Sequence, residues 1–165
     1  NTVGIVGMGR LGNIVADILT GFGAKIIAYD IKNFKNDSLE NADTLIELVE
    51  KSNIISVHVD YNIDNHQMFN SNVFSHFKEG SIFINTSRGS LVDEYALLDS
   101  LKEKRIMGAA LDVIENEHNF SSSPLIKYAQ ENDNLILTPH IGGSTYESFE
   151  KTEKFLANKL VSHII

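Results

Sequence analysis

The chain has 165 residues, a formal net charge of −8 at pH 7 and no cysteine. This length suits one domain that buries its own apolar core, and the lack of cysteine suits a reducing compartment such as the cytoplasm. The negative charge disfavours nucleic acid and anionic lipid as partners. No apolar run approaches the ~20 residues of a membrane-spanning helix. We therefore expect a cytoplasmic globular domain that binds neither nucleic acid nor membranes.

The two ends of the sequence add an expectation about domain organisation. A buried-strand pattern begins as early as Val3, and the sequence stops inside the apolar stretch 160–165. We therefore expect residues 1–165 to be a single domain of a longer protein.

Short apolar runs rich in β-branched residues alternate with segments of helical spacing. The runs are residues 3–6, 25–29, 54–59, 81–84, 107–111 and 135–137. Strands that are apolar on both faces and alternate with helices form parallel sheets covered on both sides. The pattern predicts a doubly wound α/β fold of about six strands with helices on both faces.

Five segments have the apolar spacing of helices, namely residues 11–19, 44–52, 72–78, 93–104 and 144–165. The first should bury one face, made of Leu11, Ile14, Val15, Ile18 and Leu19. The polar segment 114–134 contains Pro124 and predicts a long irregular loop, which in a compact domain usually has a function.

The first strand and the first helix are joined by the turn Gly7-Met8-Gly9-Arg10-Leu11-Gly12, which matches the pattern G-x-G-x-x-G. Gly7 would permit the tight turn, Gly9 would leave room for a pyrophosphate, and Gly12 would let helix and strand pack closely. The N–H groups at Arg10 and Leu11, together with the helix dipole, would hold the anion. This context predicts a dinucleotide site in a Rossmann fold.

The second predicted strand ends at Asp30, 18 residues after Gly12. A carboxylate at this place can accept hydrogen bonds from both hydroxyls of the adenosine ribose, and it repels a 2′-phosphate. NAD is therefore the expected cofactor rather than NADP, although Lys32 and Lys35 add positive charge nearby. The alternative is that Asp30 only caps the following turn.

Three later segments each follow a predicted strand and carry polar side chains. They are Asn85-Thr86-Ser87-Arg88-Gly89, then Ala110-Leu111-Asp112-Val113 with Glu117 close behind, and Thr138-Pro139-His140-Ile141-Gly142-Gly143-Ser144-Thr145. All three would project from the carboxyl edge of the sheet, where open α/β folds bind ligands. In order and spacing they resemble the D-isomer-specific 2-hydroxyacid dehydrogenase family over essentially the whole chain. The last segment is most similar to the phosphoglycerate dehydrogenases of that family.

The resemblance implies an NAD-dependent enzyme that oxidises a D-2-hydroxy acid, possibly 3-phosphoglycerate, to a 2-oxo acid. Arg88 would hold the substrate's carboxylate and carbonyl oxygen, because a guanidinium is always charged and can bind bidentately. His140 would take the hydroxyl proton, and Glu117 would orient its ring and stabilise its protonated form. The residues implied as cofactor contacts are Thr86, Ser87, Asp112, Gly142 and Gly143, with Asp112 at the nicotinamide carboxamide.

Some choices stay open at this stage. Glu115 and Glu117 lie in the same polar segment, and only the family spacing, five residues after Asp112, favours Glu117. The chain also departs from the family at Asp60 and His118, where the family usually has proline.

The resemblance further implies a homodimer built through this domain, with segment 114–134 as the expected contributor. It also implies a separate substrate domain, absent from this chain, without which turnover should be low. The alternative function is an NAD-sensing, corepressor-like binding module of the same family. We expect no metal site.

Overall fold

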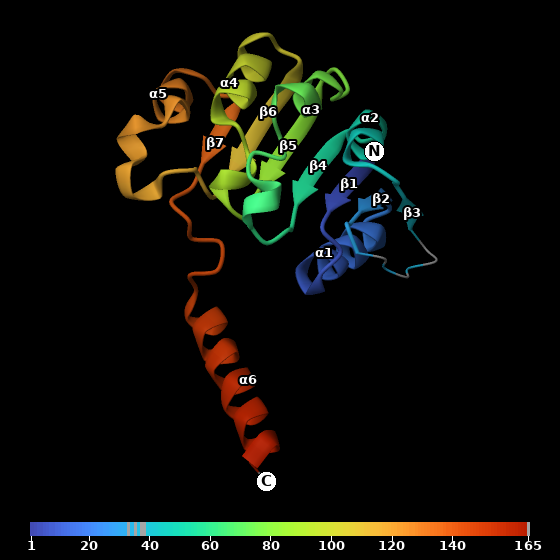
Figure 1. Cartoon of the computed structure of the whole chain (residues 1–165), viewed down its shortest axis with the longest axis vertical. Helices are drawn as coiled ribbons and strands as arrows, with labels where there is room; N and C mark the ends of the chain where they lie inside the picture. The colour runs from blue at the N-terminus through green and yellow to red at the C-terminus, as the bar shows by residue number, and fades with distance from the viewer. Residues whose placement is uncertain (33, 35, 37–38, 165) are drawn as a thin grey trace.

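The computed structural model describes residues 1–32, 34, 36 and 39–164. Its centre is a seven-stranded sheet in the order β3-β2-β1-β4-β5-β6-β7, in which all neighbours are parallel (Figure 1). The strands are β1 (Thr2–Val6), β2 (Lys25–Tyr29), β3 (Glu40–Asn41), β4 (Ile54–Val57), β5 (Ser81–Asn85), β6 (Ile106–Leu111) and β7 (Leu135–Leu137). The chain reverses direction across the sheet between β1 and β4, as in doubly wound folds. The predicted α/β fold is confirmed.

The strand that the sequence did not predict is β3, at one edge of the sheet. It has two residues, which pair with Ile27 and Ala28 of β2. Because Glu40 and Asn41 are polar and the strand is so short, it leaves no apolar run in the sequence.

Six α-helices connect or follow the strands: α1 (Arg10–Gly21), α2 (Leu45–Lys51), α3 (Ser71–Ser75), α4 (Glu94–Lys102), α5 (Pro124–Glu131) and α6 (Tyr146–Ile164) among the described residues. Three 3-10 turns accompany them: η1 (Ile63–Asn65), η2 (Gly89–Leu91) and η3 (Glu117–Ser122). The last helix begins at Tyr146, two residues after the start of the predicted segment, and its N-terminal N–H of Ser148 is accepted by the side chain of Thr145 rather than of Ser144. None of the helices in the described ranges is long and apolar enough to cross a membrane.

The prediction of an irregular loop over 114–134 is wrong. This segment contains η3 and α5, and α5 buries Leu125. Pro124 occupies the first turn of α5, after Ser123, whose side chain accepts the N–H of Leu125. Proline is favoured at the start of a helix, where its missing N–H costs nothing, so here it marks a helix start rather than a loop.

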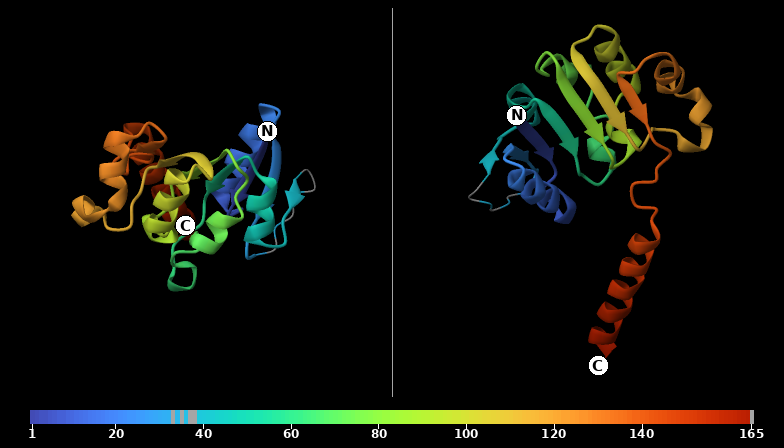
Figure 2. Two further views of the ribbon diagram at one scale, coloured as in Figure 1. Left: turned by 90° about the horizontal axis from the view of Figure 1, so that it is seen from above. Right: turned by 180° about the vertical axis from the view of Figure 1, so that it is seen from behind.

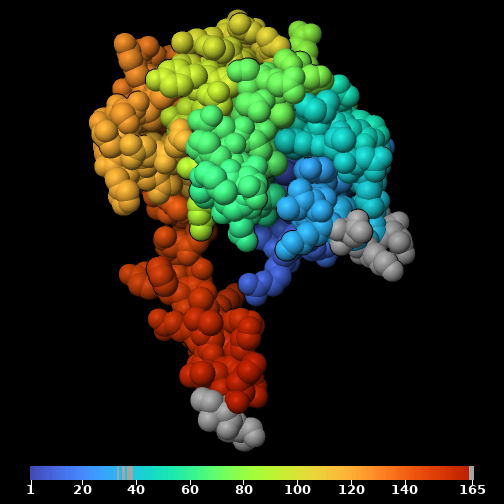
Figure 3. All heavy atoms as spheres, viewed as in Figure 1, coloured from blue at the N-terminus to red at the C-terminus, as the bar shows by residue number. Residues whose placement is uncertain are grey.

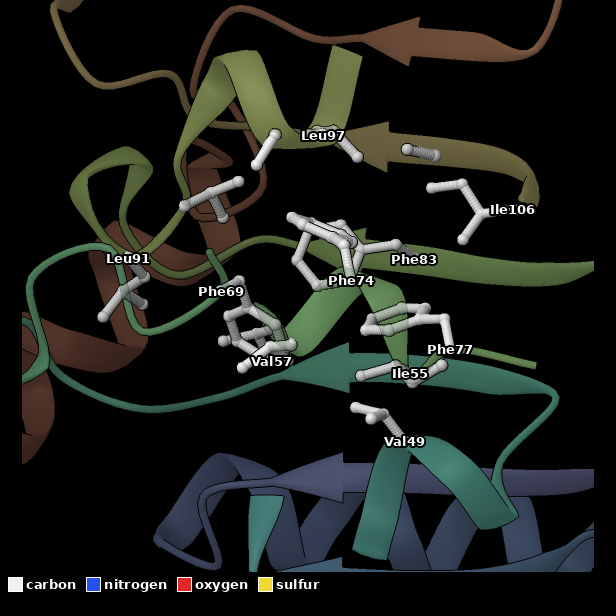
Figure 4. Close-up of a cluster of buried hydrophobic side chains, with 14 of the residues drawn as sticks. Val49, Ile55, Val57, Phe69, Phe74, Phe77, Phe83, Leu91, Leu97 and Ile106 are labelled. Carbon is white, nitrogen blue, oxygen red and sulfur yellow. The ribbon is translucent and has the colours of Figure 1, made fainter. Parts of the chain in front are cut away.

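The two faces of the sheet are covered unequally. A large core joins one face to α2, α3, α4 and α5, and its centre is a group of aromatic rings (Figure 4). These rings, of Phe69, Phe74, Phe77 and Phe83, have centroids 4.9 to 6.4 Å apart. A smaller core joins β1 and β2 to α1 on the other face.

The other face is open over β5, β6 and β7. Ile84, Ala110 and Ile136 are register partners across these strands, and the side chain of Ile136 is 61% exposed. Seen from behind, no helix of the described residues lies over this part of the sheet (Figure 2). The helix α6 extends away from the sheet (Figure 3) and exposes Phe149 and Phe155.

The contact between α1 and the sheet differs from the predicted one. Val15 and Leu19 pack against the smaller core, but Leu11, Ile14 and Ile18 are each more than half exposed. The buried residues of α1 are Gly12 and Ala16, which are small enough to bring the helix backbone close to β1. The prediction of the buried face is therefore correct for Val15 and Leu19 and wrong for the other three residues.

Candidate functional site

The glycine-rich turn lies at the carboxyl end of β1, where the sheet reverses its strand order. Gly7 has φ +98°, which favours glycine, and a Cβ on Gly12 would lie 1.9 Å from the carbonyl oxygen of Gly7. A Cβ on Gly9 would contact nothing within 4 Å. The fold itself therefore requires Gly7 and Gly12, whereas Gly9 leaves open space beside the turn.

The start of α1 offers hydrogen-bond donors toward that space. Gly9 is the N-cap residue, no side chain caps the helix, and its first turn contains no acidic residue. The first N–H groups of a helix have no partners within the helix, and the dipole favours an anion there. Arg10 and Leu11, both exposed, stand at this point. The arrangement fits the predicted pyrophosphate site.

Asp30 follows β2 and lies beside the glycine-rich turn. Its Oδ2 accepts the N–H of Met8 at 2.7 Å, and its Oδ1 accepts the N–H of Lys32 at 2.8 Å. Asp30 thus does cap turns, as the alternative interpretation expects. Each carboxylate oxygen retains a second lone pair, so a contact with ribose hydroxyls is compatible with this geometry. Lys35 lies outside the described residues.

A cavity of about 310 Å³ lies between the ends of β1, β4 and β5. Its walls combine predicted cofactor contacts with residues after β4, namely Gly9, Arg10, Leu11, His58, Val59, Asp60, Thr86, Ser87 and Arg88. No ion pair of the described residues involves Arg10 or Arg88. Their charges are therefore available to an anionic ligand.

Asn85 shapes the turn that carries Arg88. This fully buried residue ends β5; its Oδ1 accepts the N–H of Ser87 at 2.9 Å, and its Nδ2 donates to the carbonyl oxygen of Arg88 at 3.0 Å. The hydroxyl of Ser87 donates to the carbonyl oxygen of Val57 on the neighbouring strand. Sequence reasoning did not single out Asn85. A buried amide needs partners, but its partners cannot be identified from the sequence.

His58 is a second residue that the sequence did not single out. It follows β4 and lines the 310 Å³ cavity, and its Nε2 lies 2.9 Å from the hydroxyl of Ser56. Burial lowers the pKa of His58, which favours a neutral imidazole at pH 7. The cavity wall at this point is therefore polar but uncharged.

The structure brings His140 and Glu117 together from the segments after β7 and β6. Nδ1 of His140 lies 2.9 Å from Oε2 of Glu117, and the two side chains are 45% and 41% exposed. Glu115 instead faces His66, at 3.7 Å. With Nδ1–H donating to Glu117, the neutral imidazole presents Nε2 as an acceptor. A general base needs this form.

Asp112, at the end of β6, holds the segment around His140. It is 6% exposed and accepts hydrogen bonds from the hydroxyl of Thr138 and from the N–H groups of Ile141 and Gly142, the latter two at 3.0 and 2.7 Å. Burial acts to raise the pKa of Asp112, but these hydrogen bonds outweigh it and lower the pKa. Within this frame His140 has φ +53°, the left-handed conformation.

Asp112 and Gly142 therefore have structural contacts that the sequence did not predict. A Cβ on Gly142 would lie 2.9 Å from Oδ2 of Asp112, whereas a Cβ on Gly143 would meet nothing within 4 Å. Gly142 is thus needed for the approach of the two segments, and Gly143 leaves space as Gly9 does.

A second cavity, of about 590 Å³, lies beside the pair of His140 and Glu117. Its walls are largely apolar and consist of Asp112, Ile114, Glu117, His118, Phe120, Ile126, Leu137, Thr138, Pro139 and His140. His118, at the place where proline is usual, is exposed and lines this wall, and Glu117 still reaches His140. The described residues contain no cluster of three potential metal-ligating His, Cys, Asp or Glu side chains.

Comparisons with known proteins agree with this geometry. The chain is 38% identical over 152 residues to a D-lactate/D-glycerate dehydrogenase of Pediococcus acidilactici, a match that covers 84% of this chain and 45% of that protein. It is 36% identical over 162 residues to the D-3-phosphoglycerate dehydrogenase of Escherichia coli (strain K12), covering 98% and 40%. The chain thus spans about half the length of the curated relatives it matches.

Among solved structures, a D-lactate dehydrogenase from Aquifex aeolicus complexed with NAD and lactic acid superposes with a TM-score of 0.82. The sequences are 31% identical, and the match covers 99% of this chain and 53% of that one. The family model of the D-isomer specific 2-hydroxyacid dehydrogenase NAD-binding domain matches residues 1–142. The chain therefore belongs to the D-isomer specific 2-hydroxyacid dehydrogenase family, as its NAD-binding domain.

Proposed function

We propose that residues 1–165 form the NAD-binding domain of a larger, two-domain enzyme that oxidises a D-2-hydroxy acid to the 2-oxo acid. The observation that carries this proposal is the hydrogen bond between His140 and Glu117, 2.9 Å long, at the carboxyl edge of the sheet. Such a pair, exposed beside a cavity, can exchange a proton with a bound hydroxyl group.

NAD fits the other half of the same edge. Gly9 leaves the space that a Cβ would fill, and the uncapped start of α1 faces it. Gly7 and Gly12 shape the turn, Arg10 and Leu11 would supply N–H groups, and Asp30 would bind the ribose hydroxyls. We assign the remaining contacts to Thr86, Ser87, Asp112, Gly142 and Gly143.

The chemical step is a balanced oxidation. When bound, NAD would supply the acceptor for the hydride that leaves C2 of the hydroxy acid. The hydroxyl proton passes to Nε2 of His140, so that the carbon–oxygen bond becomes a carbonyl. Glu117 stabilises the imidazolium that forms. Arg88, which has no carboxylate partner among the described residues, binds the substrate carboxylate.

The substrate class is proposed at the level of D-2-hydroxy acids, with 3-phosphoglycerate and lactate as first candidates. The relatives named above act on D-lactate, D-glycerate and D-3-phosphoglycerate, according to their names. We further propose that the full-length protein is a cytoplasmic homodimer, to which the segment with η3 and α5 contributes. A monomer in light scattering at micromolar concentration would contradict this.

The test is to measure turnover of a panel of D-2-hydroxy acids by the full-length protein, with NADH formation monitored by its absorbance. We expect activity with at least one D-acid and none with its L-isomer. The isolated domain should bind NADH and turn over little substrate. If the full-length protein binds NADH and changes its protein partners with NADH but oxidises no acid, the corepressor-like function replaces the proposed one.

A further inference from the structure

Glu94 is a buried acidic residue that the proposed function does not use. It is the first residue of α4, and its side chain is 8% exposed. Burying a carboxyl group is costly unless hydrogen bonds compensate, and an apolar residue at such a place is often more stabilising. The hydrogen-bond partners of Glu94 therefore indicate what it does.

Both oxygens of Glu94 bind the segment 115–123, one at each end. Oε1 accepts the backbone N–H of Glu115 at 2.9 Å, and Oε2 accepts the hydroxyl of Ser123 at 2.6 Å. Ser123 is itself buried and is the N-cap residue of α5. Glu94 thus fixes both ends of the segment in which Glu117 lies.

Between its two ends this segment lies on the surface. Residues 115–122 are all exposed, and η3 is kinked at Asn119. Apart from the bonds of Ser123 to the first turn of α5, the hydrogen bonds that tie residues 115–123 to other parts of the described chain are those of Glu94 and the pair of Glu117 and His140. His66 adds only a 3.7 Å contact to Glu115. Glu94 therefore makes the side-chain hydrogen bonds that hold the two ends of the segment carrying Glu117.

The same anchor lies against the turn of Arg88. A Cβ on the next residue, Gly89, would come within 1.9 Å of the carbonyl carbon of Ile114, directly before the residue whose N–H binds Glu94. The backbone of the Arg88 turn and the start of the Glu117 segment thus pack against each other. A shift of the backbone at Glu115 would therefore displace both the Arg88 turn and the segment that carries Glu117.

We propose that Glu94 is a positioning residue for the acid–base pair: it holds segment 115–123 so that Glu117 stays within hydrogen-bond distance of Nδ1 of His140. The partner of one imidazole nitrogen decides which nitrogen carries the proton. Without Glu94 the segment moves and the hydrogen bond between Glu117 and Nδ1 of His140 breaks. His140 then shifts toward the tautomer protonated at Nε2. That tautomer cannot accept the substrate proton at Nε2.

The test measures this tautomer directly, without substrate. In the full-length protein labelled with ¹⁵N-histidine, the shifts of the two ring nitrogens report the tautomer at about pH 8.5, where histidine is ordinarily neutral. The His140 signals are identified by their loss in His140→Gln. We expect wild type to be mainly protonated at Nδ1. In Glu94→Ala the ratio of Nε2–H to Nδ1–H should rise about fivefold, as in Glu117→Ala.

Two further variants separate positioning from simple loss of stability. Asp93→Ala removes the cap of α4, whose carboxylate accepts the N–H groups of Tyr95 and Ala96, but it leaves the bonds of Glu94 in place. It should lower stability and leave the tautomer unchanged. Glu94→Gln should also retain the wild-type tautomer, because its amide can accept from Glu115 and donate to Ser123.

If Glu94→Ala does not fold, Ser123→Ala tests the proposal, because it removes one of the two hydrogen bonds of Glu94. It should shift the tautomer ratio in the same direction as Glu94→Ala, but by a smaller factor. The inference is overturned if folded Glu94→Ala, or folded Ser123→Ala in its place, keeps the wild-type tautomer. The effect on turnover rests on the proposed function: Glu94→Ala should lower kcat and leave NADH affinity unchanged. If wild type oxidises no hydroxy acid, the proposed function fails. The tautomer measurement on His140 still tests the positioning role of Glu94, because it uses no substrate.

Discussion

The two ends of the candidate site are built in different ways. On the β1 side the backbone does the positioning: Gly7 and Gly12 shape the turn, and the start of α1 presents N–H groups. On the β6 and β7 side buried carboxylates do it, with Asp112 holding the segment of His140 and Glu94 holding that of Glu117. A backbone site tolerates many side-chain changes, whereas a site held by single side chains depends on each of them.

The largest effect should come from the proposed proton acceptor, His140. In the full-length protein, His140→Gln should lower kcat by roughly 100-fold or more, because the hydroxyl proton loses its acceptor. NADH affinity, measured by calorimetry, should stay nearly unchanged, since His140 is not among the proposed cofactor contacts and the pyrophosphate and ribose contacts lie on the β1 side. Near-normal kcat in this variant would mean that another group takes the proton.

Replacing Arg88 should affect binding as well as rate. Arg88→Ala removes the anchor of the substrate carboxylate from both ground and transition states, so KM should rise and kcat should fall, together by roughly 100-fold in kcat/KM. Steady-state kinetics separates the two constants. Arg105→Ala, on a half-buried arginine paired with Glu103, is the matched control and should leave both unchanged.

Asp112→Asn should reduce stability, because an amide cannot accept all three hydrogen bonds that the carboxylate accepts; a loss of about 1–3 kcal/mol is expected from urea unfolding. The lowered pKa of Asp112 sets the pH dependence. A group whose pKa is lower in the folded state stabilises above its unfolded pKa, and this stabilisation is lost as pH falls. The gap between wild type and Asp112→Asn should therefore shrink below about pH 4.

The control for this experiment is Asp99→Asn, on an exposed carboxylate of α4. Its stability should follow that of wild type at every pH. A gap between wild type and Asp112→Asn that stays constant down to pH 3 would show that ionisation of Asp112 does not contribute.

The smallest effect should appear on the backbone-built side. NADH should bind at least roughly tenfold more tightly than NADPH, because Asp30 would face the 2′-phosphate. Asp30→Asn, which can still accept the N–H of Met8, should narrow that gap. Equal affinities of wild type for the two nucleotides in calorimetry would remove Asp30 from the ribose site.

The same contrast explains what the sequence predicted. The glycine-rich turn is contiguous, so its residues and their order identified both the fold and the cofactor class. The pairing of Glu117 and His140 came from a family resemblance, since residues 23 positions apart in the chain leave no local signal. Asn85 and Glu94 were not singled out, because a buried polar side chain looks like an exposed one until its surroundings are known.

The errors have equally physical causes. Pro124 in a polar segment predicts a loop, although proline at the start of a helix is favourable. The apolar positions of α1 were expected on one buried face, but the close contact through Gly12 and Ala16 leaves Ile14 and Ile18 exposed. In both cases the local sequence pattern does not determine the structure. Whether proline begins a helix, and which face of a helix is buried, is decided by tertiary contacts.

At position 140 the left-handed backbone makes glycine or asparagine more favourable for stability, whereas the proposed proton transfer requires histidine. A residue other than glycine with φ near +53° carries a local strain of about 1–2 kcal/mol. Variants selected for heat resistance alone would therefore accumulate glycine or asparagine at this position. A library screened in parallel for thermal tolerance and for turnover should show opposite preferences at residue 140.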